Sequence, residues 1–311
     1  MLDPPISPPT RCLIVGAGGF LGSHCSARAE TRGWTVERWR SSADDSSGWF
    51  SRIREGAFDV VINAAARTFR QPESDLFSDY WAANVDLPAR LAQATAAVNT
   101  TFVHVSTHWA GMAQGERALS MYSATKALGE TIVAGTRGPG TPARRRCHVV
   151  RVRDLFGPGD QRRNVLRVLS DDYQAGIRPD MTSGWQLIDP LDVRDVSDAI
   201  LRLAEVSAAH PTTPVVTELA LEPMSVRQLV ALWNRVSGDN CRPNWGALPD
   251  RGTEIYSMPR NCPPLVFFTA REREITLRDV AQDLSARRDA IARSPLPASV
   301  RLGGRRANHD Q

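Results

Sequence analysis

Short apolar runs and helix-length amphipathic segments alternate along the first half of the chain. Runs rich in β-branched residues predict strands at residues 12–15, 35–39, 59–63, 101–106 and 147–153. Apolar residues at helical spacing predict helices at residues 20–32, about 78–99 and 120–134, and Pro88 predicts a kink or a first turn in the second of them. Because strands that alternate with helices build βαβ units, we expect an α/β protein with a doubly wound parallel sheet, the Rossmann architecture.

The pattern becomes less regular after Arg153, and proline and asparagine gather between residues 241 and 264. Helices are predicted at residues 164–174, 192–205, 225–236 and about 277–292, and a strand is predicted at residues 214–221. We expect residues 11–153 to form the Rossmann domain and residues 188–221 to return to it. Residues 154–187 and 222–293 would then form a smaller, loop-rich C-terminal part that binds the substrate. Residues 294–311 are expected to be a disordered tail.

The composition is that of an ordinary soluble protein, with 42% hydrophobic and 23% charged residues among 311. The net charge of +4 suits an anionic small molecule, but it is too small and too dispersed to indicate nucleic-acid binding. Five scattered cysteines show no metal-ligand spacing, so we expect reduced thiols and no metal site. No apolar run is long enough for a signal peptide or a membrane helix, and we therefore expect a cytoplasmic protein without membrane contact.

A glycine-rich segment follows the first predicted strand. In "VGAGGFLG", Gly16, Gly19 and Gly22 have the spacing G-x-x-G-x-x-G and lie directly before a predicted helix. Glycines permit a tight turn and a close approach of a diphosphate, and the helix N-terminus offers partial positive charge to it. A purely structural turn is the alternative, but the strand-loop-helix context favours dinucleotide binding.

The end of the second predicted strand indicates which dinucleotide is bound. A cofactor with a free ribose 2′-hydroxyl usually meets an acidic side chain there, whereas this chain has Arg40 followed by Ser41. An arginine can clamp a 2′-phosphate through charge-assisted hydrogen bonds. We therefore expect NADP(H) rather than NAD(H). An exposed arginine without a ligand is the alternative, because the chain is rich in arginine.

Lys126 is the only lysine among the 38 lysine and arginine residues, and it follows Tyr122 by four positions. Helical residues four apart share a face, so the two side chains point the same way. A tyrosine with a pKa near 10 is a weak acid-base catalyst at neutral pH until a cation stabilises its phenolate. Lys126 can supply that charge and can bind a nicotinamide ribose, while Thr107, at the end of a strand, can bind a substrate oxygen. Coincidence is the alternative reading of this spacing.

Seven motifs, which span residues 16–196, resemble those of one family: "GAGGFLG" (16–22), "NAAA" (63–66), "NVDLP" (84–88), "ST" (106–107), "YSATK" (122–126), "RDLFGPGD" (153–160) and "TSGWQLIDPLDVRDV" (182–196). The chain resembles the extended short-chain dehydrogenases/reductases of the NAD(P)-dependent sugar epimerase/dehydratase type. The resemblance implies that Thr107, Tyr122 and Lys126 are catalytic. It also implies cofactor contacts at Gly16, Gly19, Phe20, Leu21, Gly22, Asn63, Ala64, Ala65, Asn84, Tyr122 and Lys126.

Departures from the family pattern narrow the expected reaction. Sugar dehydratases follow the catalytic threonine with Asp-Glu, whereas this chain has His108 and Trp109, so dehydration is disfavoured. The short interval between Thr107 and Tyr122 resembles that of CDP-abequose synthases and NDP-4-keto-6-deoxyhexose 4-ketoreductases. Ile188 stands where the family usually has an arginine that holds the sugar nucleotide. The candidate substrate contacts are His108, Trp109, Asp154, Arg162 and Arg251, and Arg251 matches an arginine that contacts the nucleotide diphosphate in these relatives.

The resemblance and the departures together predict an NADPH-dependent ketoreductase that acts on a nucleotide-activated deoxysugar. Reduction of a ketone without a nucleotide, such as a polyketide, is the first alternative and would suit Ile188. A nucleotide-sugar epimerase comes next, and a cofactor-sensing protein without turnover is the last alternative. A homodimer is usual for the family. For Trp109, packing in the core is an alternative to a substrate contact. For Arg162, the alternative is an ordinary surface charge.

Overall fold

A six-stranded parallel sheet forms the centre of the molecule in the computed structural model, which describes residues 10–40, 48–68, 76–114, 117–118, 120–136, 146–209, 215–252, 254–260, 262–265 and 268–293. The strand order is β12-β7-β4-β3-β1-β2. The strands are β1 (Arg11–Val15), β2 (Thr35–Trp39), β3 (Val60–Asn63), β4 (Thr101–Thr107), β7 (Cys147–Val152) and β12 (Val215–Leu219). The order reverses between β1 and β3, as in a doubly wound fold, so the predicted fold class is confirmed.

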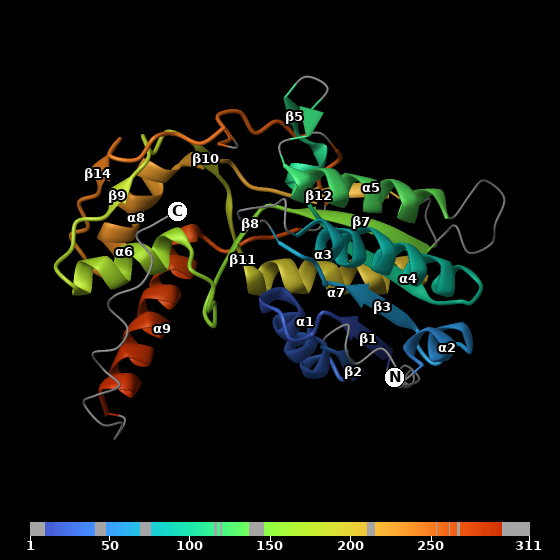
Figure 1. The fold of residues 1–311 in the computed structure, drawn as a ribbon. Coiled ribbons are helices and arrows are strands. Elements are labelled where there is room, and N and C mark those ends of the chain that lie inside the picture. Colours follow the sequence, from blue (N-terminus) through green and yellow to red (C-terminus); the bar gives the residue numbers. More distant parts are fainter. Residues whose placement is uncertain are drawn as a thin grey trace.

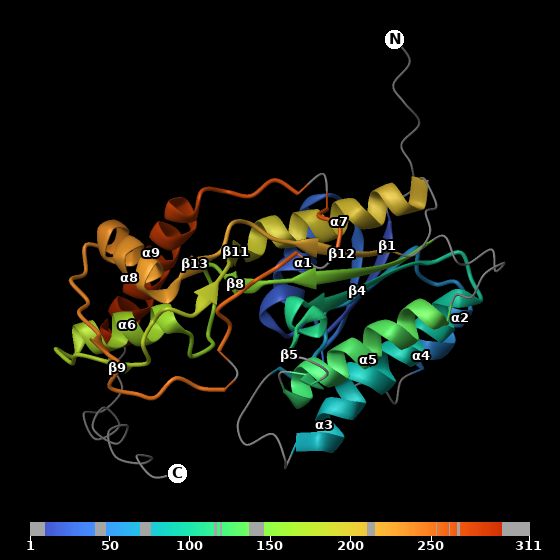
Figure 2. The same ribbon diagram turned by 90° about the horizontal axis from the view of Figure 1, so that it is seen from above.

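Helices cover both faces of this sheet (Figure 2). One face carries α1 (Phe20–Thr31) and α7 (Val193–Ala209), and the other carries α2 (Trp49–Arg54), α3 (Phe77–Trp81), α4 (Leu87–Ala96) and α5 (Met121–Gly135). The apolar runs of the strands follow from this arrangement, since alternate residues enter different cores. Cys12 and Ile14 pack with α1 and α7, whereas Leu13 and Val15 pack with α4 and α5.

The predicted helix at residues 78–99 is divided into three pieces. After α3, residues Ala82–Asp86 form a π-helical turn, and α4 then begins at Leu87 with Pro88 in its first turn. Asp86, directly before α4, has helical dihedral angles, so Pro88 removes one N–H from a continuous helical stretch at the point where the π-helical turn passes into α4. Pro88 thus lies in the first turn of α4, which was one of the two predicted positions. The short helix α2 and the hairpin of β5 (Ala113–Gln114) and β6 (Arg117–Ala118) were not predicted.

A smaller C-terminal part stands beside the carboxyl end of the sheet (Figure 1). Its helices are α6 (Val165–Gln174), α8 (Val226–Ser237) and α9 (Arg273–Arg293), which begins four residues before the predicted start at Leu277. Short strand pairs join it: β8 (Asp154–Phe156) with β11 (Pro190–Asp192), β10 (Leu187–Ile188) with β13 (Met224–Ser225), and β9 (Asp180–Met181) with β14 (Asn244–Trp245). Leu166, Leu229, Trp233 and Leu277 form the centre of its apolar core. The predicted tail, residues 294–311, lies outside the described residues.

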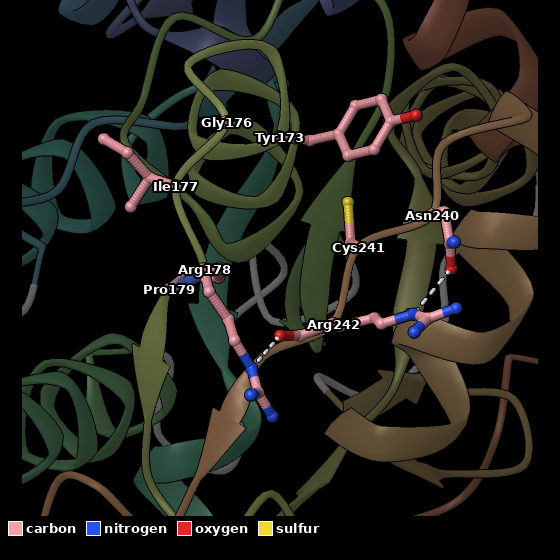
Figure 3. A pocket seen from close by; sticks show the side chains of 8 residues that line it. All are labelled: Tyr173, Gly176, Ile177, Arg178, Pro179, Asn240, Cys241 and Arg242. Carbon is pink, nitrogen blue, oxygen red and sulfur yellow. Dashed lines mark hydrogen bonds between the residues drawn. The ribbon is translucent and has the colours of Figure 1, made fainter.

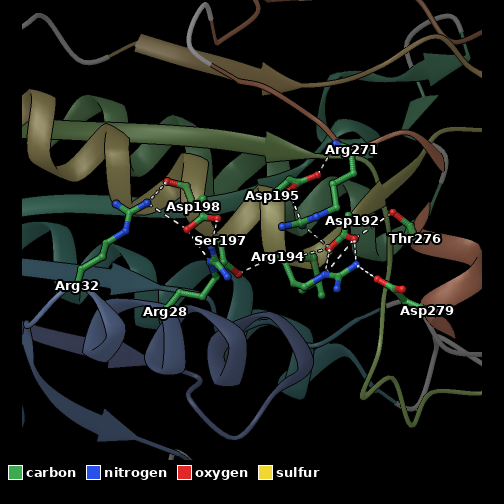
Figure 4. A network of polar contacts seen from close by, with 11 residues as sticks. Arg28, Arg32, Asp192, Arg194, Asp195, Ser197, Asp198, Arg271, Thr276 and Asp279 are labelled. Carbon is green, nitrogen blue, oxygen red and sulfur yellow. Dashed lines mark hydrogen bonds and ion pairs between the residues drawn. The ribbon is translucent and has the colours of Figure 1, made fainter. Parts of the chain in front are cut away.

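A polar network holds α9 to the end of β11 and the start of α7 (Figure 4). The buried carboxylate of Asp192 accepts hydrogen bonds from Arg194 and, at 3.0 Å, from the hydroxyl of Thr276. Arg194 also donates to Asp279 at 2.7 Å, and Arg271 lies 3.5 Å from Asp192. Because these groups belong to segments far apart in the sequence, the network fixes the C-terminal part against the sheet.

Candidate active site

The glycine loop joins β1 to α1 at the carboxyl end of the sheet. Gly16 has a φ of +81°, and a Cβ at this position would lie 2.6 Å from the backbone nitrogen of Ala65. A Cβ on Gly22 would lie 2.2 Å from the carbonyl oxygen of Gly16, so the helix starts in contact with the loop. The helix begins at Phe20 and has no side-chain cap at Gly19, which leaves its first N–H groups available to an anion. These features fit the diphosphate of a dinucleotide.

Two asparagines brace the segment after β3, beside the glycine loop. The Asn63 side chain accepts a hydrogen bond from the backbone N–H of Ala65 at 3.2 Å, which closes a turn around Ala64. Asn84 accepts from the backbone N–H of Arg67 and donates to its carbonyl oxygen, both at 3.0 Å. These amides bind the protein's own backbone. The two asparagines thus shape the predicted cofactor site by holding this segment in place.

Arg40 follows β2 directly and lies beside the glycine loop. A Cβ on Gly18 would be 3.7 Å from the Cβ of Arg40, and the backbone N–H of Gly16 donates to the carbonyl oxygen of Trp39 at 2.8 Å. The Arg40 side chain is exposed and therefore available to a cofactor ribose at this edge. Ser41, the other predicted contact, lies outside the described residues, and Leu21 is buried in the core beneath α1.

Thr107 and Tyr122 come together where β4 ends and α5 begins. A hydrogen bond joins their side chains, and the Thr107 hydroxyl also accepts from the backbone N–H of Trp109 at 3.3 Å. The Tyr122 ring lies between those of Trp109 and Tyr80, with centroids 6.1 and 6.4 Å away. Burial raises the pKa of Tyr122 to about 12, although the hydrogen bond with Thr107 opposes this. The phenol therefore keeps its proton at neutral pH.

Lys126 lies one helical turn after Tyr122 and is 1% exposed. Its Nζ donates to the carbonyl oxygen of Val105 in β4 at 2.8 Å. Burial lowers the pKa of Lys126 to about 8, while the charge of Glu130 raises it. From the sequence we expected Lys126 to lower the pKa of Tyr122. In the structure burial prevails at Tyr122, and the net shift of its pKa is upward.

Two of the candidate substrate contacts act on the Tyr122 hydroxyl through their charges. Asp154, in β8, accepts a hydrogen bond from the backbone N–H of Asp189 at 2.9 Å, and burial raises the pKa of Asp154 to about 6. Arg162 lies over the ring of Phe20, with its guanidinium carbon 4.7 Å from the ring centroid. Asp154 raises the pKa of Tyr122 and Arg162 lowers it. Both residues therefore lie at the same end of the sheet as the catalytic candidates.

His108 is buried and neutral. Its Nδ1 donates to the carbonyl oxygen of Val152 at 3.4 Å, and burial lowers the pKa of His108 to about 4. The His108 ring meets the partly buried ring of Trp109 edge-on. His108 thus supports the strand end behind Thr107, whereas Trp109 contacts the Tyr122 ring itself.

Arg251 is exposed on a loop of the C-terminal part. This loop is tied to the segment before β10, since Asp250 accepts from the backbone N–H of Ser183 at 2.8 Å. Ile188 packs against the apolar core of the C-terminal part. The Arg251 loop and the segment to which it is tied belong to the C-terminal part, whereas Thr107 ends β4 and Tyr122 lies on α5. Arg251 therefore remains a candidate on a separate loop.

Glu130 and Arg151 were missed as site residues. Glu130 lies four positions after Lys126, and its carboxylate accepts three hydrogen bonds from two nitrogens of Arg151 in β7, the shortest at 2.7 Å. The spacing of Glu130 from Lys126 was the available signal, because it repeats the spacing of Lys126 from Tyr122. The position of Arg151 opposite this carboxylate depends on how α5 packs on β7.

A separate cavity of about 330 Å³ lies in the C-terminal part between the end of α6 and residues 240–242 (Figure 3). Arg178 crosses its edge and donates to the carbonyl oxygen of Arg242 at 2.8 Å. The cavity contains none of the predicted site residues. Within the described parts of the chain, no cluster of three potential metal ligands occurs, and no helix has the length and apolarity to span a membrane.

A sequence model of the "NAD dependent epimerase/dehydratase family" matches residues 12–216. Over 102 residues, the chain is 38% identical to a dTDP-4-dehydrorhamnose reductase of Mycobacterium tuberculosis (strain ATCC 25618 / H37Rv), covering 32% of this chain and 33% of that protein. It is 37% identical over 100 residues to the dTDP-4-dehydrorhamnose reductase of Mycolicibacterium smegmatis, covering 32% and 31%. The chain thus aligns with about a third of the length of these relatives.

Solved structures show the same fold at low sequence identity. MoeE5 in complex with UDP-glucuronic acid and NAD has a TM-score of 0.75 and 19% identity, covering 89% of this chain and 99% of that one. UDP-glucose-4-epimerase from Stenotrophomonas maltophila, with bound NAD and formylated UDP-arabinopyranose, has a TM-score of 0.77 and 15% identity, covering 90% and 99%.

Proposed function

Because the chain belongs to the NAD-dependent epimerase/dehydratase family, we propose that it is an NADPH-dependent ketoreductase of nucleotide-activated deoxysugars. The observation that carries the proposal is the geometry of Tyr122, whose phenol hydrogen-bonds Thr107 and lies one helical turn before the buried Lys126. A protonated phenol beside a hydroxyl suits the reduction of a carbonyl, which needs a proton on its oxygen. The partial similarity to dTDP-4-dehydrorhamnose reductases supports a 4-keto-6-deoxyhexose as the substrate.

The catalytic groups have distinct roles in this proposal. A bound nicotinamide would supply the hydride. The Thr107 hydroxyl would orient and polarise the carbonyl through a hydrogen bond, and Tyr122 would donate its proton to the carbonyl oxygen. The Lys126 ammonium, held by the Val105 carbonyl oxygen at 2.8 Å, would stabilise the phenolate that remains.

We further propose that the cofactor is NADPH. Arg40 is exposed beside the glycine loop, where its guanidinium could bind a ribose 2′-phosphate. The two similar solved structures contain NAD, but those proteins are only 19% and 15% identical to this chain. The choice between the two cofactors therefore depends on Arg40.

The substrate contacts are proposed at Trp109, Asp154, Arg162 and Arg251. Arg162 is our candidate to replace the arginine absent at Ile188, because it lies over Phe20 of the predicted cofactor loop, where Asp160 holds its guanidinium at 2.8 Å. One observation favours a second candidate function, the reduction of a ketone without a nucleotide. Ile188 packs in an apolar core and leaves no cation at the position where the family holds the sugar nucleotide.

The test is to follow NADPH absorbance with the purified chain, using a panel of dTDP- and CDP-linked 4-keto-6-deoxysugars and matched ketones without a nucleotide. We expect oxidation of NADPH by the nucleotide-linked substrates, and its loss in Tyr122→Phe, which should still bind NADPH. Turnover confined to simple ketones would support the second candidate. Interconversion of two nucleotide sugars without net NADPH consumption would indicate an epimerase. Tight cofactor binding without any turnover would indicate a sensor.

A further inference from the structure

A buried ion pair lies directly behind the catalytic lysine. Glu130 follows Lys126 by one helical turn on α5, so both side chains share the face that packs on the sheet. The Glu130 side chain is 6% exposed. Arg151 holds it with two nitrogens, Nε to Oε1 at 3.0 Å and Nη2 to Oε2 at 2.7 Å. A two-pronged pair of this kind fixes the position of the carboxylate.

Other ionisable groups also lie on the described elements that pack against α5. They are His104 on β4, His108 on the 3₁₀ turn His108–Gly111, Asp79 and Tyr80 on α3, Asp86 on the π-helical turn, Arg90 on α4, and Cys147, His148 and Arg151 on β7, together with Tyr122 and Glu130 on α5 itself. Asp79 and Asp86 are 53% and 50% exposed and pair with Arg67 and Arg90. Of the acidic groups on these described elements, Glu130 is thus the buried one.

His104 on β4, a second neighbour of Lys126, carries no charge. Burial holds the pKa of His104 well below its ordinary value, and the charge of Lys126 lowers it further. The Nδ1 of His104 lies 3.1 Å from the side-chain nitrogen of Asn63, within the sheet. His104 therefore cannot balance the charge of the lysine, whereas the carboxylate of Glu130, one helical turn away on the same face of α5, can.

We propose that Glu130, fixed by Arg151, is a positioning residue that keeps Lys126 in its ammonium form and thereby sets the upper pH limit of the reaction. The part that concerns the reaction rests on the proposed ketoreductase function. A lysine in an apolar site tends to lose its proton, because burial disfavours the charged form. A fixed carboxylate one turn away opposes that loss, since it stabilises the ammonium.

The direction of the pH effect follows from these contributions. Burial lowers the pKa of Lys126 to about 8 even though the charge of Glu130 raises it. Glu130→Gln removes the raising contribution and leaves the burial, so the pKa of Lys126 must fall further. An activity that needs the ammonium is lost as the pH rises through this pKa. The alkaline limb of kcat/KM should therefore move to lower pH in Glu130→Gln.

The single lysine permits a direct test without substrate. Lys126 is the only lysine in the chain, so incorporation of lysine labelled with ¹³C at Cε gives one side-chain NMR signal whose shift reports the charge. We expect the titration midpoint of this signal to fall by about one pH unit or more in Glu130→Gln. The experiment needs no turnover, so its failure is distinguishable from a failure of the proposed function.

Two further variants keep the test decisive. Glu37→Gln removes another two-pronged glutamate–arginine pair, in which Arg52 donates to Glu37 of β2 at 2.6 and 2.7 Å, and it should leave the lysine signal unchanged. Glu130→Gln leaves Arg151 buried without its partner and could unfold the protein. The double variant Glu130→Gln/Arg151→Gln removes both charges and should also show a lowered midpoint, with a smaller shift than Glu130→Gln alone, because no unpaired Arg151 cation then faces the lysine. A folded variant without Glu130 whose lysine titrates as in the parent protein would overturn the proposal.

Discussion

Lys126 is the residue whose exchange tests the catalytic proposal most sharply. Lys126→Arg keeps the charge, but the planar guanidinium is larger and cannot occupy the place of the ammonium at the Val105 carbonyl oxygen. Because small misplacements are costly at a reacting centre, we expect kcat/KM to fall roughly 10²-fold, with weaker NADPH binding. Steady-state kinetics measure this, and circular dichroism should show an intact fold. Near-normal turnover would mean that the lone lysine is an accident of composition.

At the same scale, Arg40 tests the proposed choice of cofactor. Arg40→Asp replaces the proposed charge-assisted contact with repulsion at the exposed edge beside Gly18. We expect NADPH binding to weaken by about 2–4 kcal/mol and NADH binding to change little. Titration of both cofactors by fluorescence or calorimetry measures the difference. Equal losses for the two cofactors would contradict the assignment of Arg40 to the 2′-phosphate.

At the scale of elements, the close approach of α5 to the π-helical turn positions Tyr122 and Lys126. A Cβ on Gly129 would lie 2.1 Å from the carbonyl oxygen of Asn84, so the two backbones touch. Gly129→Ala must push α5 outward, and we expect it to cost about 1–3 kcal/mol of unfolding free energy and most of the activity. Gly135→Ala, on the same helix with open space around its Cβ, should be neutral or stabilising. Urea denaturation compares the two, and equal stability would show that the contact relaxes without cost.

The sequence indicates the elements and the proposed catalytic pair for physical reasons that are local. The pattern of apolar residues differs between strands buried on both faces and the amphipathic helices between them, so each can be recognised from the sequence. Tyr122 and Lys126 share a helix face because they are four residues apart. Two other features cannot be predicted in this local way: the Glu130–Arg151 pair and the hydrogen bonds from Asn84 to the Arg67 backbone. They depend on which elements pack together, and an arginine-rich sequence offers too many partners to choose from.

At the scale of the whole molecule, the network at Asp192 joins the sheet to α9. Burial alone would raise the pKa of Asp192, but hydrogen bonds from Arg194 and Thr276 hold it below the ordinary 3.8. A carboxyl whose pKa is lower in the folded than in the unfolded protein stabilises the fold at every pH above its unfolded-state pKa. This stabilisation is lost as the pH falls through its folded-state pKa. We expect Asp192→Asn to reduce the unfolding free energy by roughly 3 kcal/mol at neutral pH.

The pH dependence supplies the control for that variant. The difference between Asp192→Asn and the parent protein should shrink below pH 3.8, where the carboxyl in the unfolded chain is protonated. Chemical denaturation across this range measures it. A difference that stays constant with pH would show that the loss comes from packing and not from charge. Exposed Asp171→Asn, which removes a pair with Arg167, is the matched comparison and should change stability little.

The burial of the sole lysine also has a consequence for covalent chemistry on this protein. Apart from the α-amino group, the one amine that an amine-directed reagent can modify is the side chain of Lys126. This side chain is 1% exposed. The folded protein should therefore resist modification at that site, and any adduct there would record a moment when α5 moved away from β4. The rate of acylation at Lys126, followed by mass spectrometry, would thus report local opening of the site in a protein whose surface cations are all arginines.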